Sequence, residues 1–92
     1  MKIFVYPAVF VKDNEEEKFL VHFPDLDITT DGAFVEEAFL YAKEALKAYF
    51  VYIEKYDLDF NLPSEYAVMS KNLSKSDILM LIDAEVQPGD LK

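Results

Sequence analysis

The sequence has no cysteine, no tryptophan and no arginine, and only two glycines and one histidine among its 92 residues. Without cysteine, neither a disulfide nor a thiolate metal site can form, and a reducing, cytoplasmic location is the simplest expectation. No apolar run approaches the roughly 20 residues of a membrane span, and the first residues lack the pattern of a signal peptide. We therefore expect a cytoplasmic protein that does not contact a membrane.

Basic residues are scarce, because nine lysines stand against 18 acidic residues and the net charge is −9. Nucleic acid repels such a chain, since affinity for it depends on neutralising phosphates. A basic protein would instead be attracted and steered, although the same acidity also serves solubility alone. The charge argues against direct nucleic-acid binding and leaves a basic protein partner and simple solubility as open alternatives.

Apolar side chains are abundant for so short a chain, with 52% hydrophobic residues, eight phenylalanines and six tyrosines. This length allows one domain, and the composition is too hydrophobic for a disordered chain. One small core cannot hold all of these side chains. We therefore expect a self-association surface, in a homodimer or a homotetramer.

Hydrophobic periodicity predicts the first four elements. Alternation predicts strands over residues 2–12 and 18–24, joined by an acidic turn, and a short third strand over 28–31 that Gly32 ends. Apolar residues at helical spacing predict one long helix over residues 35–56. These elements form a three-stranded antiparallel meander with the helix packed on the sheet.

The remainder of the chain is predicted to contain a short helical turn and a final strand. The turn spans residues 63–69 with Ser64 as its cap, and an uninterrupted apolar run predicts a buried strand within 77–86. The β-β-β-α-β order is typical of an α+β domain. We expect one domain over residues 1–87 and a frayed tail over 88–92.

The first strand is apolar on both sides, so both sides should be covered. We expect the helix to cover one side and a second subunit to cover the other. Phe50 and Val51 add apolar surface beside the main stripe of the helix. The expected oligomer interface therefore contains Tyr6, Phe10, Phe50 and Val51.

No pattern of residues predicts catalysis or a cofactor. His22 has no histidine, cysteine or hydroxyl partner at a suggestive spacing, so a structural or surface role is expected. Asp25, Asp27 and Asp31 surround one turn, where carboxylates either bond nearby backbone amides or hold Mg²⁺, and we favour the turn chemistry. We expect no catalytic residue, no metal and no cofactor.

Six stretches, taken in order, resemble the HicB-like antitoxin family, and together they span nearly the whole chain. They are residues 6–10 (YPAVF), 23–26 (FPDL), 30–38 (TDGAFVEEA), 42–46 (AKEAL), 62–64 (LPS) and 82–86 (IDAEV). The resemblance implies a partly degenerate ribonuclease-H-like α+β fold. It also implies a HicA-like toxin as partner, a small basic protein that cleaves mRNA and whose RNA-facing surface the antitoxin covers.

Five acidic residues within or beside these motifs are the toxin contacts that this resemblance and the negative charge lead us to expect. They are Asp25, Asp27, Asp31, Glu36 and Glu37. A carboxylate at these positions meets a basic surface where phosphate would otherwise lie.

The sequence departs from the family pattern at two places. Asp27 and Ile28 stand where many relatives have a proline–glycine pair, which shortens the turn. The sequence ends at Lys92, where many relatives continue into a DNA-binding segment. Either no C-terminal DNA-binding domain is present, which is our expectation, or this sequence is shorter than the native one. The first strand also lacks the acidic residue that two-metal nuclease chemistry needs, which predicts an inherited fold without the activity.

Three functions therefore remain as hypotheses. The first is an antitoxin that neutralises a basic toxin by binding it. The second is a stand-alone interaction or scaffold domain without a toxin, and the third is a residual metal-dependent nuclease. A neighbouring gene for a short basic protein would favour the first.

Overall fold

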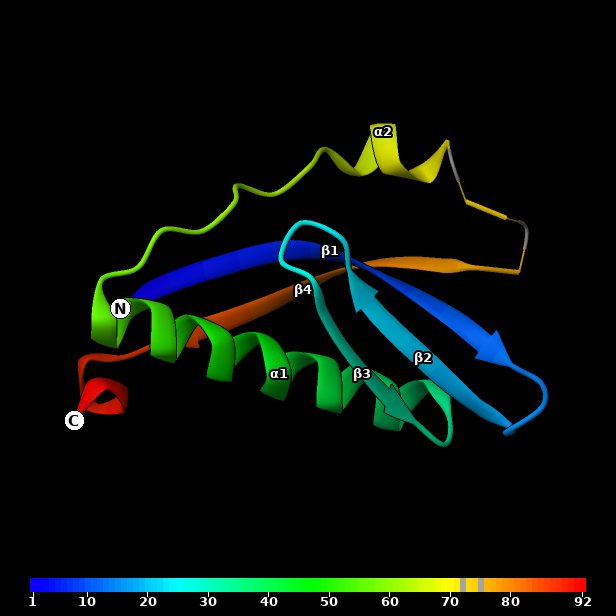
Figure 1. The fold of residues 1–92 in the computed structure, drawn as a ribbon, viewed down its shortest axis with the longest axis horizontal. Coiled ribbons are helices and arrows are strands. Elements are labelled where there is room, and N and C mark those ends of the chain that lie inside the picture. Colours follow the sequence, from blue (N-terminus) through cyan, green and yellow to red (C-terminus); the bar gives the residue numbers. More distant parts are fainter. Residues whose placement is uncertain (72, 75) are drawn as a thin grey trace.

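The computed structural model describes residues 1–71, 73–74 and 76–92, which form one sheet with a long helix packed against it (Figure 1). The elements are β1 Lys2–Asp13, β2 Lys18–Phe23, β3 Ile28–Gly32, α1 Val35–Tyr56, α2 Tyr66–Ser70, β4 Ile78–Val86 and the 3₁₀ turn η1 Pro88–Leu91. The expected α+β class and order of elements are confirmed. No helix within the described residues is long and apolar enough to cross a bilayer.

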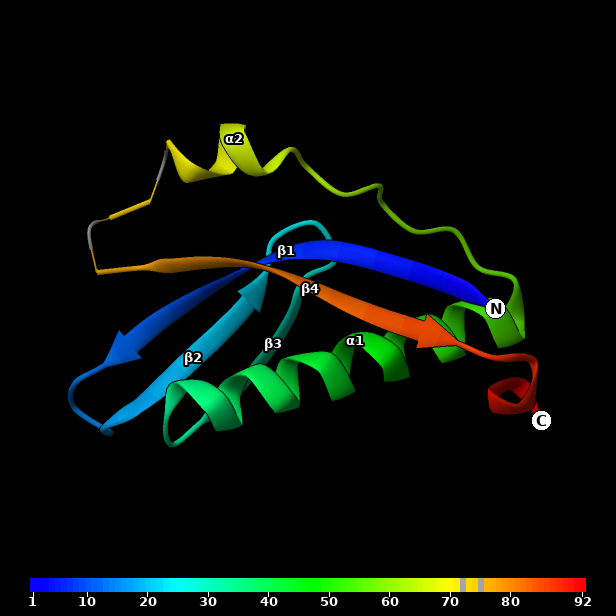
Figure 2. The same cartoon turned by 180° about the vertical axis from the view of Figure 1, so that it is seen from behind.

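The four strands form one antiparallel sheet in the order β3-β2-β1-β4. The first three strands make the expected meander, and β4 returns late in the chain to lie beside β1 (Figure 2). β4 pairs along residues 2–10 of β1, whereas β2 pairs only along residues 9–13. Pro7 therefore lies where β1 has one neighbouring strand, which is a position where a sheet tolerates proline.

The core forms between α1 and one face of the sheet. Tyr6 and Phe10 of β1 face the helix and are buried. Phe50 of α1 stacks on Phe4 with ring centroids 3.9 Å apart, and Phe60 meets Phe50 edge-on at 5.1 Å. Each such aromatic pair adds about 0.5–1.5 kcal/mol to the stability gained from buried area. The cluster therefore ties the first strand, the helix and the segment after the helix into one unit.

This packing corrects three of the four residues expected at an oligomer interface. Tyr6, Phe10 and Phe50 are 2%, 0% and 0% exposed within a single chain, so their surface is already taken by the chain's own core. Phe50 points inward because it continues the stripe of Leu46 and Ile53 at helical spacing. Val51 keeps partial exposure.

α1 begins at a close contact with the end of β3. A Cβ atom on Gly32 would lie 2.4 Å from the backbone nitrogen of Ala38, so only glycine fits there. Phe34 holds the N-cap position and makes no side-chain capping hydrogen bond. Instead, the Glu37 carboxylate accepts a 2.9 Å hydrogen bond from the backbone N–H of Ala33. Tight packing and this one carboxylate therefore fix the start of the helix.

The short helix differs from its expected form. α2 has Glu65 at its N-cap, so the expectation of a Ser64 cap is wrong. The Ser64 hydroxyl donates instead to the carboxylate of Asp25, 39 residues earlier in the chain. Ser64 therefore bonds a residue distant in sequence and does not cap the helix that begins beside it.

The C-terminal residues also differ from the frayed tail that the sequence predicts. They form η1, whose capping box joins the side chains of Gln87 and Asp90 to each other's backbone N–H groups. Leu91 packs against the core, and Asp90 lies 3.6 Å from the ammonium group of Lys47 on α1. These contacts dock the turn against α1.

Candidate partner-binding surface

The five acidic residues expected at a partner interface lie along one edge of the sheet and not in one cluster. Asp25 and Asp27 lie in the turn between β2 and β3, and Asp31 lies on β3 itself. Glu36 and Glu37 follow in the first turn of α1. Because β3 runs from the turn to the start of α1 (Figure 1), a partner would have to span that whole edge to contact all five.

Asp31 and Glu37 already have partners within the chain. A carboxylate oxygen of Asp31 accepts a 2.9 Å hydrogen bond from the ammonium group of Lys18. This hydrogen bond raises the pKa of Lys18 above its usual value, and a second hydrogen bond, to Glu16, raises it further. The Glu37 carboxylate accepts the hydrogen bond from the backbone N–H of Ala33 at the start of α1. Asp31 and Glu37 therefore offer less uncompensated charge to a partner than the sequence implies.

Asp25 fastens the segment that follows α1 to the turn between β2 and β3. Its carboxylate accepts hydrogen bonds from the backbone N–H and the hydroxyl of Ser64. The side-chain amide of Asn61 donates to the Asp25 carbonyl at 2.9 Å, and the Tyr6 hydroxyl donates to the Asn61 carbonyl. Asp25 is therefore a structural residue, and its carboxylate is held in a fixed position.

An acidic hollow lies between this turn and the segment after α1. It has a volume of about 310 Å³, and its lining includes three acidic residues and two aromatic ones: Asp25, Asp27, Asp59, Tyr49 and Phe60. No described residue that lines it is basic. Three carboxylates without a compensating lysine create a negative potential that favours a cationic group. Asp59 was not among the predicted residues, because folding brings it beside the turn from more than thirty positions away.

The negative charge of the hollow affects the pKa of the buried Tyr6 hydroxyl. Burial raises the pKa of Tyr6 above its usual 10.0, and the charges of Asp25 and then Tyr49 raise it further. Tyr6 therefore remains a neutral hydrogen-bond donor at neutral pH. Its bond to Asn61 helps to keep the wall of the hollow in place.

The sheet face opposite α1 is apolar and open. Ile3 and Val5 of β1 are 55% and 42% exposed, and Leu81 of β4 is 52% exposed. Leu62, in the segment after α1, is 79% exposed. Apolar surface beside charged residues is typical of protein–protein interfaces. The sequence predicts that a second subunit covers this face of β1. In the single chain, Ile3, Val5 and Leu81 on this face remain exposed.

The described residues offer no group of three or more histidine, aspartate or glutamate side chains placed to hold a metal ion. His22 lies opposite Val9 in the ladder between β1 and β2. Asp83 of β4 lies opposite Val5 of β1 and 3.3 Å from the ammonium group of Lys43. The residue of β1 opposite Asp83 is therefore apolar and supplies no second carboxylate for a two-metal site.

The chain shares its fold with two solved structures from toxin–antitoxin systems. A toxin–antitoxin complex from Streptococcus pneumoniae matches with a TM-score of 0.78 and 19% identity, over 91% of this chain and 70% of that one. The antitoxin HicB of Burkholderia pseudomallei matches with a TM-score of 0.69 and 19% identity, over 100% of this chain and 68% of that one. Neither the protein-family models nor the curated proteins yield a match to the sequence. The HicB-like fold expected from the sequence is confirmed.

Proposed function

We propose that this chain is the antitoxin of a HicA/HicB-type pair and neutralises a small, basic, mRNA-cleaving toxin by binding it. The observation that carries the proposal is the hollow lined by Asp25, Asp27 and Asp59, to which no described residue adds a positive charge. A lysine or arginine side chain suits this hollow, because carboxylates accept its hydrogen bonds and carry the opposite charge. The HicB-like fold supports the same function.

Binding of this kind would neutralise the toxin by covering the basic surface that meets RNA. The carboxylates of the hollow would take the place of phosphate groups. Asp25 is held by Ser64 before any partner arrives, so little side-chain freedom is lost on binding. Because the attraction is partly between exposed charges, affinity should fall as salt rises. We place this pair in the cytoplasm, where mRNA is translated, and assign no nucleic-acid contact to this chain itself.

A stand-alone interaction domain is the second candidate, and the open sheet face favours it. Ile3, Val5 and Leu81 give an apolar surface that needs no basic partner. The neighbouring gene separates the two candidates. A short reading frame for a basic protein beside this gene supports the antitoxin, and a neighbourhood without one supports the stand-alone domain.

A residual nuclease is the third candidate and has the least support. Asp83 has Lys43 as its ion-pair partner and Val5 as its neighbour on β1. Incubation of the protein with RNA and with RNA–DNA hybrids in Mg²⁺ or Mn²⁺ tests this candidate. Cleavage that requires the metal would replace the antitoxin proposal.

The hollow can be tested by removing its charge without disturbing its shape. In Asp27→Asn with Asp59→Asn, two carboxylates become amides of the same size, and asparagine suits the left-handed backbone of residue 27 (φ 55°). We expect this variant to protect RNA from the cognate toxin only at about tenfold higher concentration, a loss of about 1.4 kcal/mol in binding.

The matched control removes two charges elsewhere. Glu15→Gln with Glu17→Gln alters the turn between β1 and β2, where residue 17 also has a left-handed backbone (φ 52°). This variant should protect RNA as well as the unmodified chain does. Equal protection by both variants would show that the hollow does not contact the toxin.

A further inference from the structure

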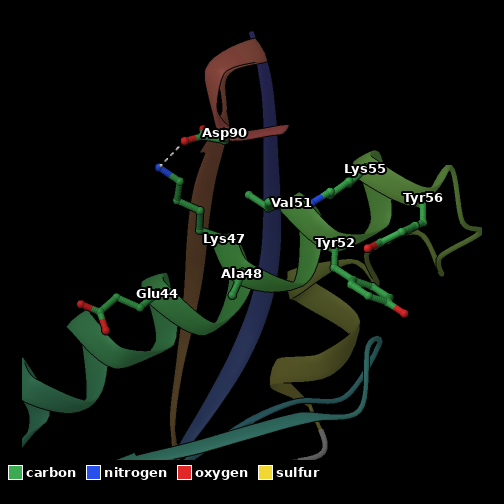
Figure 3. A pocket seen from close by; sticks show the side chains of 8 residues that line it. All are labelled: Glu44, Lys47, Ala48, Val51, Tyr52, Lys55, Tyr56 and Asp90. Atoms are coloured by element: carbon green, nitrogen blue, oxygen red, sulfur yellow. Dashed lines mark ion pairs between the residues drawn. The ribbon is translucent and has the colours of Figure 1, made fainter. Parts of the chain in front are cut away.

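A second surface lies on the outer side of α1, away from the sheet, and forms a shallow groove of about 560 Å³ between the helix and η1 (Figure 3). Its lining includes Glu44, Ala48, Val51 and Lys55, which recur at spacings of four, three and four residues. This spacing places them in one stripe along the helix. We call this surface the α1 groove.

The stripe is symmetric about its own midpoint, between residues 49 and 50. If a second copy of α1 lies antiparallel across the first at that point, Glu44 of each chain meets Lys55 of the second copy. Ala48 of each chain then meets Val51 of the second copy. Two-fold symmetry repeats each pairing, so one contact surface supplies two ion pairs and a closed apolar centre.

The stripe is flanked by exposed side chains and has a small residue at its centre. Lys47 and Tyr52 extend from opposite flanks of the stripe (Figure 3), and Lys47 already pairs with Asp90 of its own chain. Tyr52 is 58% exposed, and Figure 3 shows its ring extending from the helix. Ala48 at the centre is small, which lets two helices approach to the 8–10 Å typical of packed helices.

The charge of the α1 groove identifies its occupant. Glu44 and Asp90 balance Lys47 and Lys55, in a chain whose net charge is −9. A basic protein gains little attraction at a neutral surface. A second copy of this acidic chain meets less repulsion here than at the acidic hollow. Charge therefore favours a second copy of the chain at the α1 groove and a basic partner at the hollow.

We propose that the chain forms a two-fold symmetric dimer through antiparallel packing of its α1 grooves, with Glu44 of each subunit paired with Lys55 of the other. Val51 is the one residue of the expected interface that takes part. The dimer leaves the acidic hollow and the open sheet face available, so it does not depend on the antitoxin proposal.

Charge reversal tests the pairing. The unmodified chain should sediment at micromolar concentration with twice the 10.6 kDa mass of one chain. Glu44→Lys and Lys55→Glu should each weaken dimerisation at least tenfold, because each places like charges opposite one another twice. The double variant with both changes should recover the dimer. Glu15→Lys, which makes the same charge change in the turn between β1 and β2, should have no effect.

Cross-linking tests the geometry independently, since the chain has no cysteine of its own. A mixture of the Ala48→Cys and Val51→Cys chains should form a disulfide between the two variants on mild oxidation. A mixture of Ala48→Cys with Glu15→Cys should not.

A monomer in sedimentation would overturn the proposal, and so would a dimer that neither single charge reversal weakens or that the double variant does not recover. It would also be overturned if these reversals weakened binding to a basic toxin and left the sedimenting mass unchanged. That result would assign the α1 groove to the toxin. Far-ultraviolet circular dichroism of each variant checks that α1 is retained.

Discussion

Replacing Gly32 by alanine should destabilise the protein strongly, because β3 and α1 meet there through their backbones. The added Cβ would lie 2.4 Å from the nitrogen and 2.6 Å from the Cα of Ala38. A long side chain could rotate away from such a contact, but a backbone cannot, so the helix must move away from the strand. Overpacking of this kind costs about 1–3 kcal/mol, and backbone contact places this change near 3 kcal/mol.

A cost of about 3 kcal/mol corresponds to a fall in melting temperature of roughly 12–24 °C for a domain of this size. Thermal unfolding followed by circular dichroism measures it. Gly89→Ala is the matched control, since no atom lies within 4 Å of its added Cβ, and its effect should stay within about 0.5 kcal/mol. If the two variants melted at the same temperature, the close approach of α1 to β3 would be refuted.

Three further predictions concern the core and the hollow. Phe50→Ala should lower the free energy of unfolding in urea by about 3–5 kcal/mol, because it removes the ring on which Phe4 stacks. Burial raises the folded-state pKa of Tyr6, so the stability that this residue contributes is complete below pH 10 and is lost as the pH rises through the raised pKa. Tyr6→Phe should remove that loss in urea unfolding measured on both sides of pH 10. Asp25→Ala should release the segment after α1, detected as faster proteolysis and amide exchange over residues 58–65, while protection of α1 persists.

Local signals in the sequence predicted most of the elements. The apolar stripe of α1 is long enough that its bounds were predicted at Val35 and Tyr56, as observed. The strands of the meander are joined by short turns, so their pairing needed no distant information. The inward position of Phe50 was also readable, because Leu46, Phe50 and Ile53 share the helical spacing of a buried stripe. The error was to assign Phe50 to the surface beside that stripe.

The features that the sequence did not predict depend on contacts between distant residues. Pairing of β4 with β1 joins the two ends of the chain, and no local pattern specifies it. The acidic hollow forms only when Asp59 lies near Asp27. The hydrogen bonds that hold the segment after α1 form only when Ser64 lies beside Asp25. Individual acids could be selected from charge and motif, but their arrangement depends on how the segment after α1 folds back.

Calorimetric titration of the chain with the basic product of its neighbouring gene, repeated at rising salt, tests most directly whether the acidic hollow recognises a basic protein. We expect saturable heat at low salt, an affinity that declines steadily as salt is added, and a weaker affinity for the Asp27→Asn, Asp59→Asn chain at low salt. Absence of heat with an active toxin, or an affinity that salt and these two substitutions leave unchanged, would contradict it.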